Sequence, residues 1–70
     1  MKKEDRQIEW EERYGYYKNQ LLFFITKGSD KFYLYFLANG REVMIMDYTT
    51  VKSAKLGAER FLKRLQEAVK

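Results

Sequence analysis

Residues 31–48 read KFYLYFLANGREVMIMDY, two runs of apolar and aromatic residues on either side of Asn39-Gly40. Asn-Gly supplies the positive φ angles that a two-residue type I′ turn requires. Between two runs of strand-forming residues, this dipeptide is the strongest short-range signal of a β-hairpin. The stretch therefore predicts two antiparallel strands, residues 31–38 and 42–48.

Two further segments on the N-terminal side extend this hairpin. Residues 21–26 predict a strand, joined to the hairpin by a turn at residues 27–30, where Lys, Gly, Ser and Asp cluster. Residues 8–14 alternate between apolar and polar side chains, which favours a half-buried strand, although a helix is the competing interpretation. Gly15 ends that pattern, and residues 16–20 predict a loop or a short extension of a hairpin. Neighbouring strands of this kind predict an antiparallel meander.

On the C-terminal side, the apolar period changes from two residues to about 3.5, which is typical of an amphipathic helix. Thr49 or Thr50 can cap its N-terminus. Gly57 inside the helix indicates a close approach to the sheet. The chain is therefore predicted to have an α+β fold, a meander of three to four strands packed on one C-terminal helix. The apolar stripe of that helix consists of Val51, Ala54, Ala58, Phe61, Leu65 and Ala68 or Val69.

The composition predicts one domain and excludes most small-domain chemistry. Seventy residues with 46% apolar content and 12 aromatic side chains can build a single core, assigned to residues 8–70, after a flexible N-terminus at residues 1–7. The chain has no Cys and no His, which excludes disulfides, Cys/His zinc sites and His-based catalytic triads. The acidic cluster at residues 9–12 is typical of a solvated strand face, so we expect no enzyme activity, no metal and no cofactor.

The N-terminal residues also bear on location. The opening MKKEDRQIEWEERY is too charged for a signal peptide, and the longest uncharged run, residues 19–26, is far shorter than a membrane span. Together with the absence of Cys, this predicts a soluble, cytoplasmic protein without a membrane partner.

Alternation along the strands gives the predicted sheet two apolar faces. Phe32, Leu34 and Phe36 fall on one face. Tyr33, Tyr35 and Leu37 fall on the other. One helix covers one face, so the second needs another cover. Four covers are open: the N-terminal segment, a second copy in a homodimer, another protein, or stacked nucleobases. The same alternation sets Leu22 and Phe24 against Leu21, Phe23 and Ile25, and Val43 and Ile45 against Met44 and Met46. The candidate protein interface is Tyr33, Tyr35, Met44 and Met46.

Positive charge is concentrated in the predicted helix. Residues 50–70 contain six Lys and Arg against two Glu, a net charge of +4 that equals the charge of the whole chain. A basic helix can contact phosphates, which gives salt-dependent binding with little sequence preference. Such a helix can equally serve solubility and the helix dipole. The candidate nucleic-acid-binding residues are Lys52, Lys55, Lys63 and Arg64.

Residues 31–70 resemble the C-terminal half of a double-stranded-RNA-binding domain, in which two strands, a turn and a helix follow one another. The phrase VKSAK at residues 51–55 is similar to the lysine-rich opening of that family's helix, with Val51 at its first lysine. The resemblance implies that Lys52 and Lys55 contact phosphates at the start of the helix.

Two other resemblances overlap this stretch. The phrase YTTVKSA at residues 48–54 is similar to the start of the helix in the arm-type DNA-binding domains of tyrosine recombinases, which implies a sheet that enters the major groove. Residues 39–57 also resemble short bacterial tandem-repeat proteins of unknown role.

The sequence therefore supports two functional hypotheses. The first is a small nucleic-acid-binding or regulatory protein that uses its basic C-terminal helix. The alternative is a protein-interaction module, an inhibitor or adaptor of the kind that mobile elements encode, which binds a partner or itself through the aromatic and methionine-rich sheet face.

Overall fold

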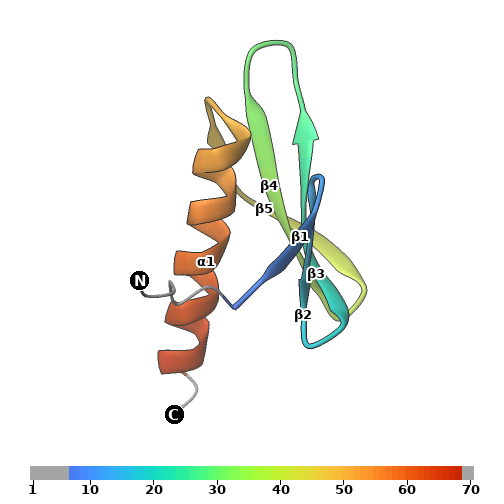
Figure 1. Cartoon of the computed structure of the whole chain (residues 1–70), viewed down its shortest axis with the longest axis vertical. Coiled ribbons are helices and arrows are strands. Elements are labelled where there is room, and N and C mark those ends of the chain that lie inside the picture. Colours follow the sequence, from blue (N-terminus) through green and yellow to red (C-terminus); the bar gives the residue numbers. More distant parts are fainter. Residues whose placement is uncertain (1–6, 69–70) are drawn as a thin grey trace.

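The computed structural model describes residues 7–68, which form one antiparallel sheet and one helix (Figure 1). The strands follow one another in the order β1-β2-β3-β4-β5, which is a simple meander. The predicted α+β fold is confirmed, with one strand more than the largest number expected. The elements are β1 (Glu9–Glu11), β2 (Tyr14–Tyr17), β3 (Gln20–Lys27), β4 (Phe32–Ala38), β5 (Arg41–Tyr48) and α1 (Val51–Ala68).

The hairpin of β4 and β5 forms where the sequence predicts it. Its two turn residues, Asn39 and Gly40, have φ angles of 53° and 78°. Two consecutive positive φ angles fit a type I′ turn, whose twist matches that of the strands it joins. The register follows from this turn, since Ala38 is opposite Arg41 and Phe32 is opposite Tyr48.

The additional strand comes from residues 8–14, which the alternation predicted as one strand. The structure divides this stretch into β1 and β2, joined by Glu12 and Arg13. Glu12 has a φ of 56°, a left-handed conformation that glutamate rarely signals from sequence. A second turn, at Lys18 and Asn19 with φ angles of 52° and 65°, joins β2 to β3. The helical interpretation of residues 8–14 is therefore wrong. For residues 16–20 the hairpin alternative is confirmed and the loop is not, since Tyr16, Tyr17 and Gln20 belong to strands.

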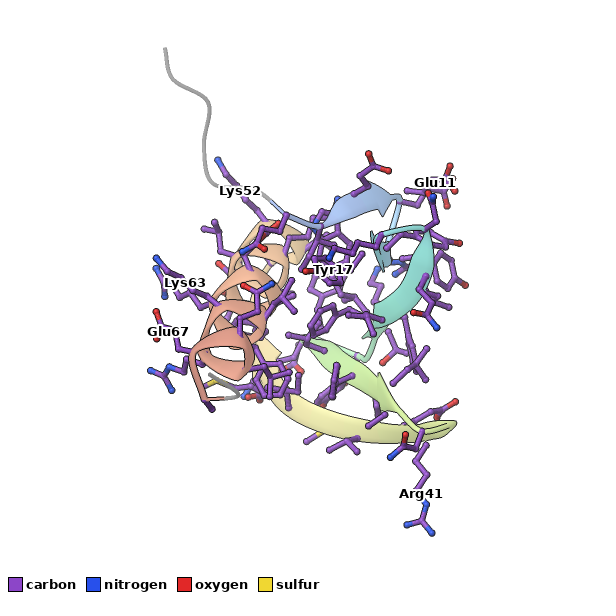
Figure 2. The ribbon with its side chains drawn as sticks, turned by 90° about the horizontal axis from the view of Figure 1, so that it is seen from below. Glu11, Tyr17, Arg41, Lys52, Lys63 and Glu67 are labelled. Atoms are coloured by element: carbon purple, nitrogen blue, oxygen red, sulfur yellow. The ribbon has the colours of Figure 1, made fainter. Side chains whose placement is uncertain are left out.

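Two β-bulges bend the sheet. The register between β2 and β3 shifts so that Leu22 has no partner, and the register between β4 and β5 shifts so that Ile45 has none. Bulges locally increase the bend and the right-handed twist of a strand. The sheet accordingly curls around one side of α1, with β1 and β5 at its two ends (Figure 2).

The core lies between the concave face of the sheet and α1. Phe23, Ile25 and Leu34 from the central strands are buried against Ala54 and Ala58 of the helix. These small alanine side chains allow the helix to lie close to the sheet, and Leu62, on the same side of α1, fills the next turn. The predicted burial of Phe32, Leu34 and Phe36 on one face is confirmed, although Phe32 and Phe36 are only half-buried.

The start of α1 is fixed by a cap and by a close contact. The Ser53 backbone N–H donates to the Thr50 hydroxyl at 3.0 Å, which identifies Thr50 as the capping residue. A Cβ at Gly57 would overlap the hydroxyl of Tyr48, so glycine leaves room for that ring between helix and sheet. This confirms the close approach that Gly57 predicted.

The N-terminal segment is held by the helix. The backbone N–H groups of Gln7 and Ile8 donate to the two carboxylate oxygens of Glu59, each at 3.1 Å. The Gln66 amide donates to the Gln7 side chain at 2.9 Å and to the Tyr17 hydroxyl at 3.1 Å. Residues 1–6 of the predicted flexible terminus lie outside the described residues. From Gln7 onward, the segment packs on the helix side and leaves the convex face of the sheet uncovered.

Candidate binding surfaces

The outer face of α1 carries most of the predicted nucleic-acid-binding residues. Lys52, Lys63 and Arg64 are exposed, and so is Arg60, which the sequence-based site did not include. The buried alanine stripe fixes this orientation, because side chains about half a turn away from it must point to solvent. Figure 2 shows Lys52 and Lys63 pointing away from the sheet. We call Lys52, Arg60, Lys63 and Arg64 the basic face.

Lys55 is placed differently from the other predicted lysines. It is half-buried, and its ammonium group lies 5.4 Å from the centre of the Trp10 ring. A cation over an aromatic face at this distance contributes about 0.5–1 kcal/mol at an exposed site. Lys52 and Lys55 both line a hollow of about 740 Å³ between α1 and the N-terminal segment. Lys55 therefore has a structural contact with β1 in addition to any ligand contact.

Leu56 lies within the basic face and is 51% exposed. It lies off the apolar stripe that packs on the sheet, which is the one sequence signal that could have singled it out. An exposed leucine surrounded by cations gives this side of the helix an apolar contact point as well as charge.

Of the two glutamates of α1, Glu67 is exposed one turn after Lys63 and Arg64, whereas Glu59 is half-buried. Glu59 directs its carboxylate at the N–H groups of Gln7 and Ile8 and therefore toward β1. The one ion pair found among the described residues joins Lys31, just before β4, to Asp47 of β5. The Lys31 Nζ and Asp47 Oδ2 atoms are 3.1 Å apart. The hydrogen bond and the charge of Lys31 lower the pKa of Asp47, and Asp47 raises the pKa of Lys31 in turn.

The convex face of the sheet holds three of the four predicted interface residues. Tyr33 and Tyr35 lie there because Leu34, between them on β4, is buried against the helix, and Met44 of β5 lies there because it is opposite Tyr35. Phe24 and Tyr35 stack with their ring centres 5.0 Å apart and their planes 7° apart. Met44 and Tyr14 at the ends of this row are about half exposed, 53% and 50%. We call these five residues the convex aromatic face.

Met46 does not join that face, so the predicted pairing of Met44 with Met46 on one side is wrong. The bulge at Ile45 breaks the alternation of β5, since Met44 is opposite Tyr35 whereas Met46 is opposite the buried Leu34. Met46 therefore lies on the helix side, 55% exposed.

Met46 lies in a hollow of about 540 Å³ between β5 and α1. The hollow has an apolar floor and a cationic wall, because Arg60 and Arg64 stand along its helix side. We call it the β5 groove. Its lining residues are Ile45, Met46, Tyr48, Ser53, Leu56, Gly57, Arg60, Phe61 and Arg64.

In residues 7–68, no group of three or more His, Cys, Asp or Glu side chains could hold a metal ion. The helix in this range is not long and apolar enough to cross a membrane. Every buried side-chain nitrogen or oxygen in the same range has a hydrogen-bond partner.

Comparison with protein-family models, curated proteins and solved structures finds no match for this chain.

Proposed function

We propose that this chain is a small nucleic-acid-binding protein that contacts phosphates through the basic face of α1. The observation that carries the proposal is the exposure of Lys52, Arg60, Lys63 and Arg64 on one rigid helix, on the side away from the sheet. Phosphate contacts of this kind need charge and reach but no specific hydrogen-bond pattern. The resemblance of residues 51–55 to the helix start of double-stranded-RNA-binding domains supports the same assignment for Lys52.

The spacing of these cations suits a polyanion. Lys52 and Lys63 are separated by about 16 Å along the helix axis, and Arg60 and Arg64 by about 6 Å. A row of this length can contact several phosphates of one backbone, and a helix holds it without ordering a loop on binding. The affinity then arises mainly from counterion release, so it depends on salt and little on sequence.

A second function is favoured by the convex aromatic face. This surface combines a stacked pair of rings, Phe24 and Tyr35, with half-exposed Tyr14 and Met44, and it lies opposite the only helix of residues 7–68. Exposed aromatic and methionine side chains are enriched in protein interfaces. We propose self-association or capture of a regulatory protein partner there, as an inhibitor or adaptor would require.

The two functions differ in their response to salt. Binding of labelled DNA and RNA duplexes, measured by fluorescence anisotropy between about 50 and 200 mM salt, should weaken steeply. The double variant Lys52→Ala/Lys63→Ala should reduce the slope of log K against log salt by about 2, because each phosphate contact contributes about 0.9. Association through the convex aromatic face should change little over the same range and should be lost in Tyr35→Ala.

A matched control separates local contacts from net charge. The double variant Lys27→Ala/Arg41→Ala removes the same charge from the sheet, and Figure 2 shows Arg41 at the hairpin tip, far from α1. It should leave the salt slope nearly unchanged. Absence of binding at about 50 mM salt, or an equal loss of slope in both double variants, would contradict the phosphate-binding function.

A further inference from the structure

The edge of the sheet at β5 has the properties of a site for strand addition. β5 is eight residues long and is the last strand of the sheet, so one side of its backbone has no neighbouring strand among residues 7–68. Its middle, Val43-Met44-Ile45-Met46, carries no charge and no proline. An exposed apolar edge of this length is a template for pairing with another extended chain.

The bulge at Ile45 changes which side chains of this edge strand face the helix. It turns Met46 toward α1, so that the edge strand itself supplies part of the floor of the β5 groove. Bulges commonly re-aim a side chain next to a functional site. A strand that pairs with β5 would therefore place every second side chain in this groove, next to Met46 and Phe61.

The opposite wall of the groove selects the charge of those side chains. Arg60 and Arg64 are exposed along it, one helical turn apart, which is about 6 Å along the axis. Side chains on one face of an extended strand are spaced by about 6.6 Å, two residues at about 3.3 Å each. Two carboxylates at alternate positions of the added strand can therefore meet the two guanidinium groups together. Such pairs form charge-assisted, often bidentate, hydrogen bonds.

A second copy of this chain fits the groove less well. Antiparallel pairing of two β5 strands about a two-fold axis would bring the two α1 helices to the same side of the joined sheet. Arg60 and Arg64 of each copy would then face the same residues of the other copy across the interface. Like charges placed together in this way oppose association.

We propose that β5 and the β5 groove bind an extended segment of another protein by strand addition. The groove-facing side chains of that segment are apolar next to Met46 and Leu56 and acidic at alternate positions next to Arg60 and Arg64. Backbone hydrogen bonds to β5 supply the pairing, and the groove supplies the selection. This site lies on the other side of the sheet from the convex aromatic face. It shares Arg60 and Arg64 with the basic face, so a bound peptide and a nucleic acid would compete for these two side chains.

The test uses two synthetic peptides at an ionic strength of about 0.15 M, without nucleic acid. In the acidic peptide, threonine alternates with the palindromic series valine, glutamate, glutamate, valine, so that either strand direction presents the same groove face. In the matched peptide, lysine replaces both glutamates. Titration into the isotope-labelled protein should shift the backbone amide resonances of residues 41–48 and of Arg60 and Arg64, and the acidic peptide should bind at least about tenfold more tightly.

Three variants identify the contacts. Arg60→Glu/Arg64→Glu should reverse the preference between the two peptides, whereas Lys52→Glu/Lys63→Glu, with the same charge change elsewhere on the helix, should keep it. Met46→Glu should weaken the acidic peptide at least about tenfold by placing a carboxylate in the groove. Met46 is 55% exposed, so this substitution leaves the core intact.

Several results would overturn the proposal. Equal affinity for both peptides, shifts confined to the convex aromatic face, or a preference unchanged by Arg60→Glu/Arg64→Glu would each contradict it. A dimer in solution whose β5 amides are already protected from hydrogen exchange would show that a second copy occupies the edge instead. None of these results bears on the salt dependence of nucleic-acid binding, so failure of the two functions can be told apart.

Discussion

The two edges of the sheet are finished in opposite ways. β1 is three residues long, two of them glutamates, and the chain that leads into it is hydrogen-bonded to Glu59 of the helix. β5 is eight residues long, apolar in its middle and mostly exposed. Short length and charge are common protections of an edge strand against unwanted pairing, and so is cover by another element. β1 has all three, whereas the uncharged middle of β5 is protected by a bulge alone.

This difference shows where the fold places stability and where it leaves a surface available. Ile8, next to β1, is 3% exposed and belongs to the central core, whereas Val43 on β5 is 48% exposed. One edge is therefore part of the structure that the chain needs in order to fold. On the other edge, Val43 lies outside the buried core cluster.

Removing an aliphatic side chain from each edge tests this difference most strongly. Ile8→Ala should lower the free energy of unfolding by about 2–5 kcal/mol, because it opens a cavity in the core. Val43→Ala should change it by less than about 0.5 kcal/mol, because this side chain is half in solvent already. Urea denaturation of both variants checks the pair, and equal losses would show that the two edges are equally structural.

The packing over Gly15 sharpens the picture of the closed edge. A Cβ added to Gly15 would lie 2.8 Å from two atoms of the Trp10 ring and 2.9 Å from the Cγ2 atom of Ile8. Gly15→Ala should therefore lower the free energy of unfolding by about 1–3 kcal/mol. Because Trp10 is the only tryptophan, its fluorescence should also change in the folded state. Gly40→Ala, with no atom within 4 Å of the added Cβ, should leave that fluorescence unchanged.

The hydrogen bonds of Glu59 give a smaller effect. Glu59→Ala removes the acceptor of two backbone N–H groups, of which the Ile8 group is partly buried, and should cost about 1 kcal/mol. Hydrogen exchange of the Ile8 amide should accelerate. Glu67→Ala, an exposed glutamate on the same helix, is the matched control and should leave that amide protected. Unchanged exchange in Glu59→Ala would mean that the hydrogen bonds to Glu59 do not hold the N-terminal segment in place.

The ion pair beside the open edge gives the smallest effect. Because Lys31 lowers the pKa of Asp47, the pair stabilises the folded state at pH values above the unfolded pKa of aspartate, and this contribution is lost as the pH falls through the lower, folded value. The Tm of Asp47→Asn should therefore be slightly lower than that of the unaltered protein near neutral pH, and the two Tm values should coincide in acid. A difference that persists in acid would require another cause.

The sequence predicts the half of the fold that contains strong local signals. Asn39-Gly40 and the period of α1 predict the C-terminal hairpin and helix, because both signals act within a few residues. The turn at Glu12 carries no such signal, since glutamate at a positive φ is imposed by the surrounding sheet. For that reason one predicted strand is two strands in the structure.

The candidate sites were predictable to a similar extent. Exposure of Lys52, Lys63 and Arg64 follows from the helical period, because it needs only the position of the apolar stripe. The position of Met46 does not follow, because a bulge adds one residue to β5 and reverses the alternation beyond it. Arg60 lines the β5 groove because α1 packs next to β5. The periods of strands and helices do not predict how two elements pack together.

The hydrogen bonds that close β1 also set when the N-terminal edge of the sheet can be completed during protein synthesis. Their partners, Glu59 and Gln66, lie in the last three turns of α1 and leave the ribosome after all five strands. The N-terminal edge can therefore close only once residues 59–66 are available to it, so completion of that edge depends on formation of the helix.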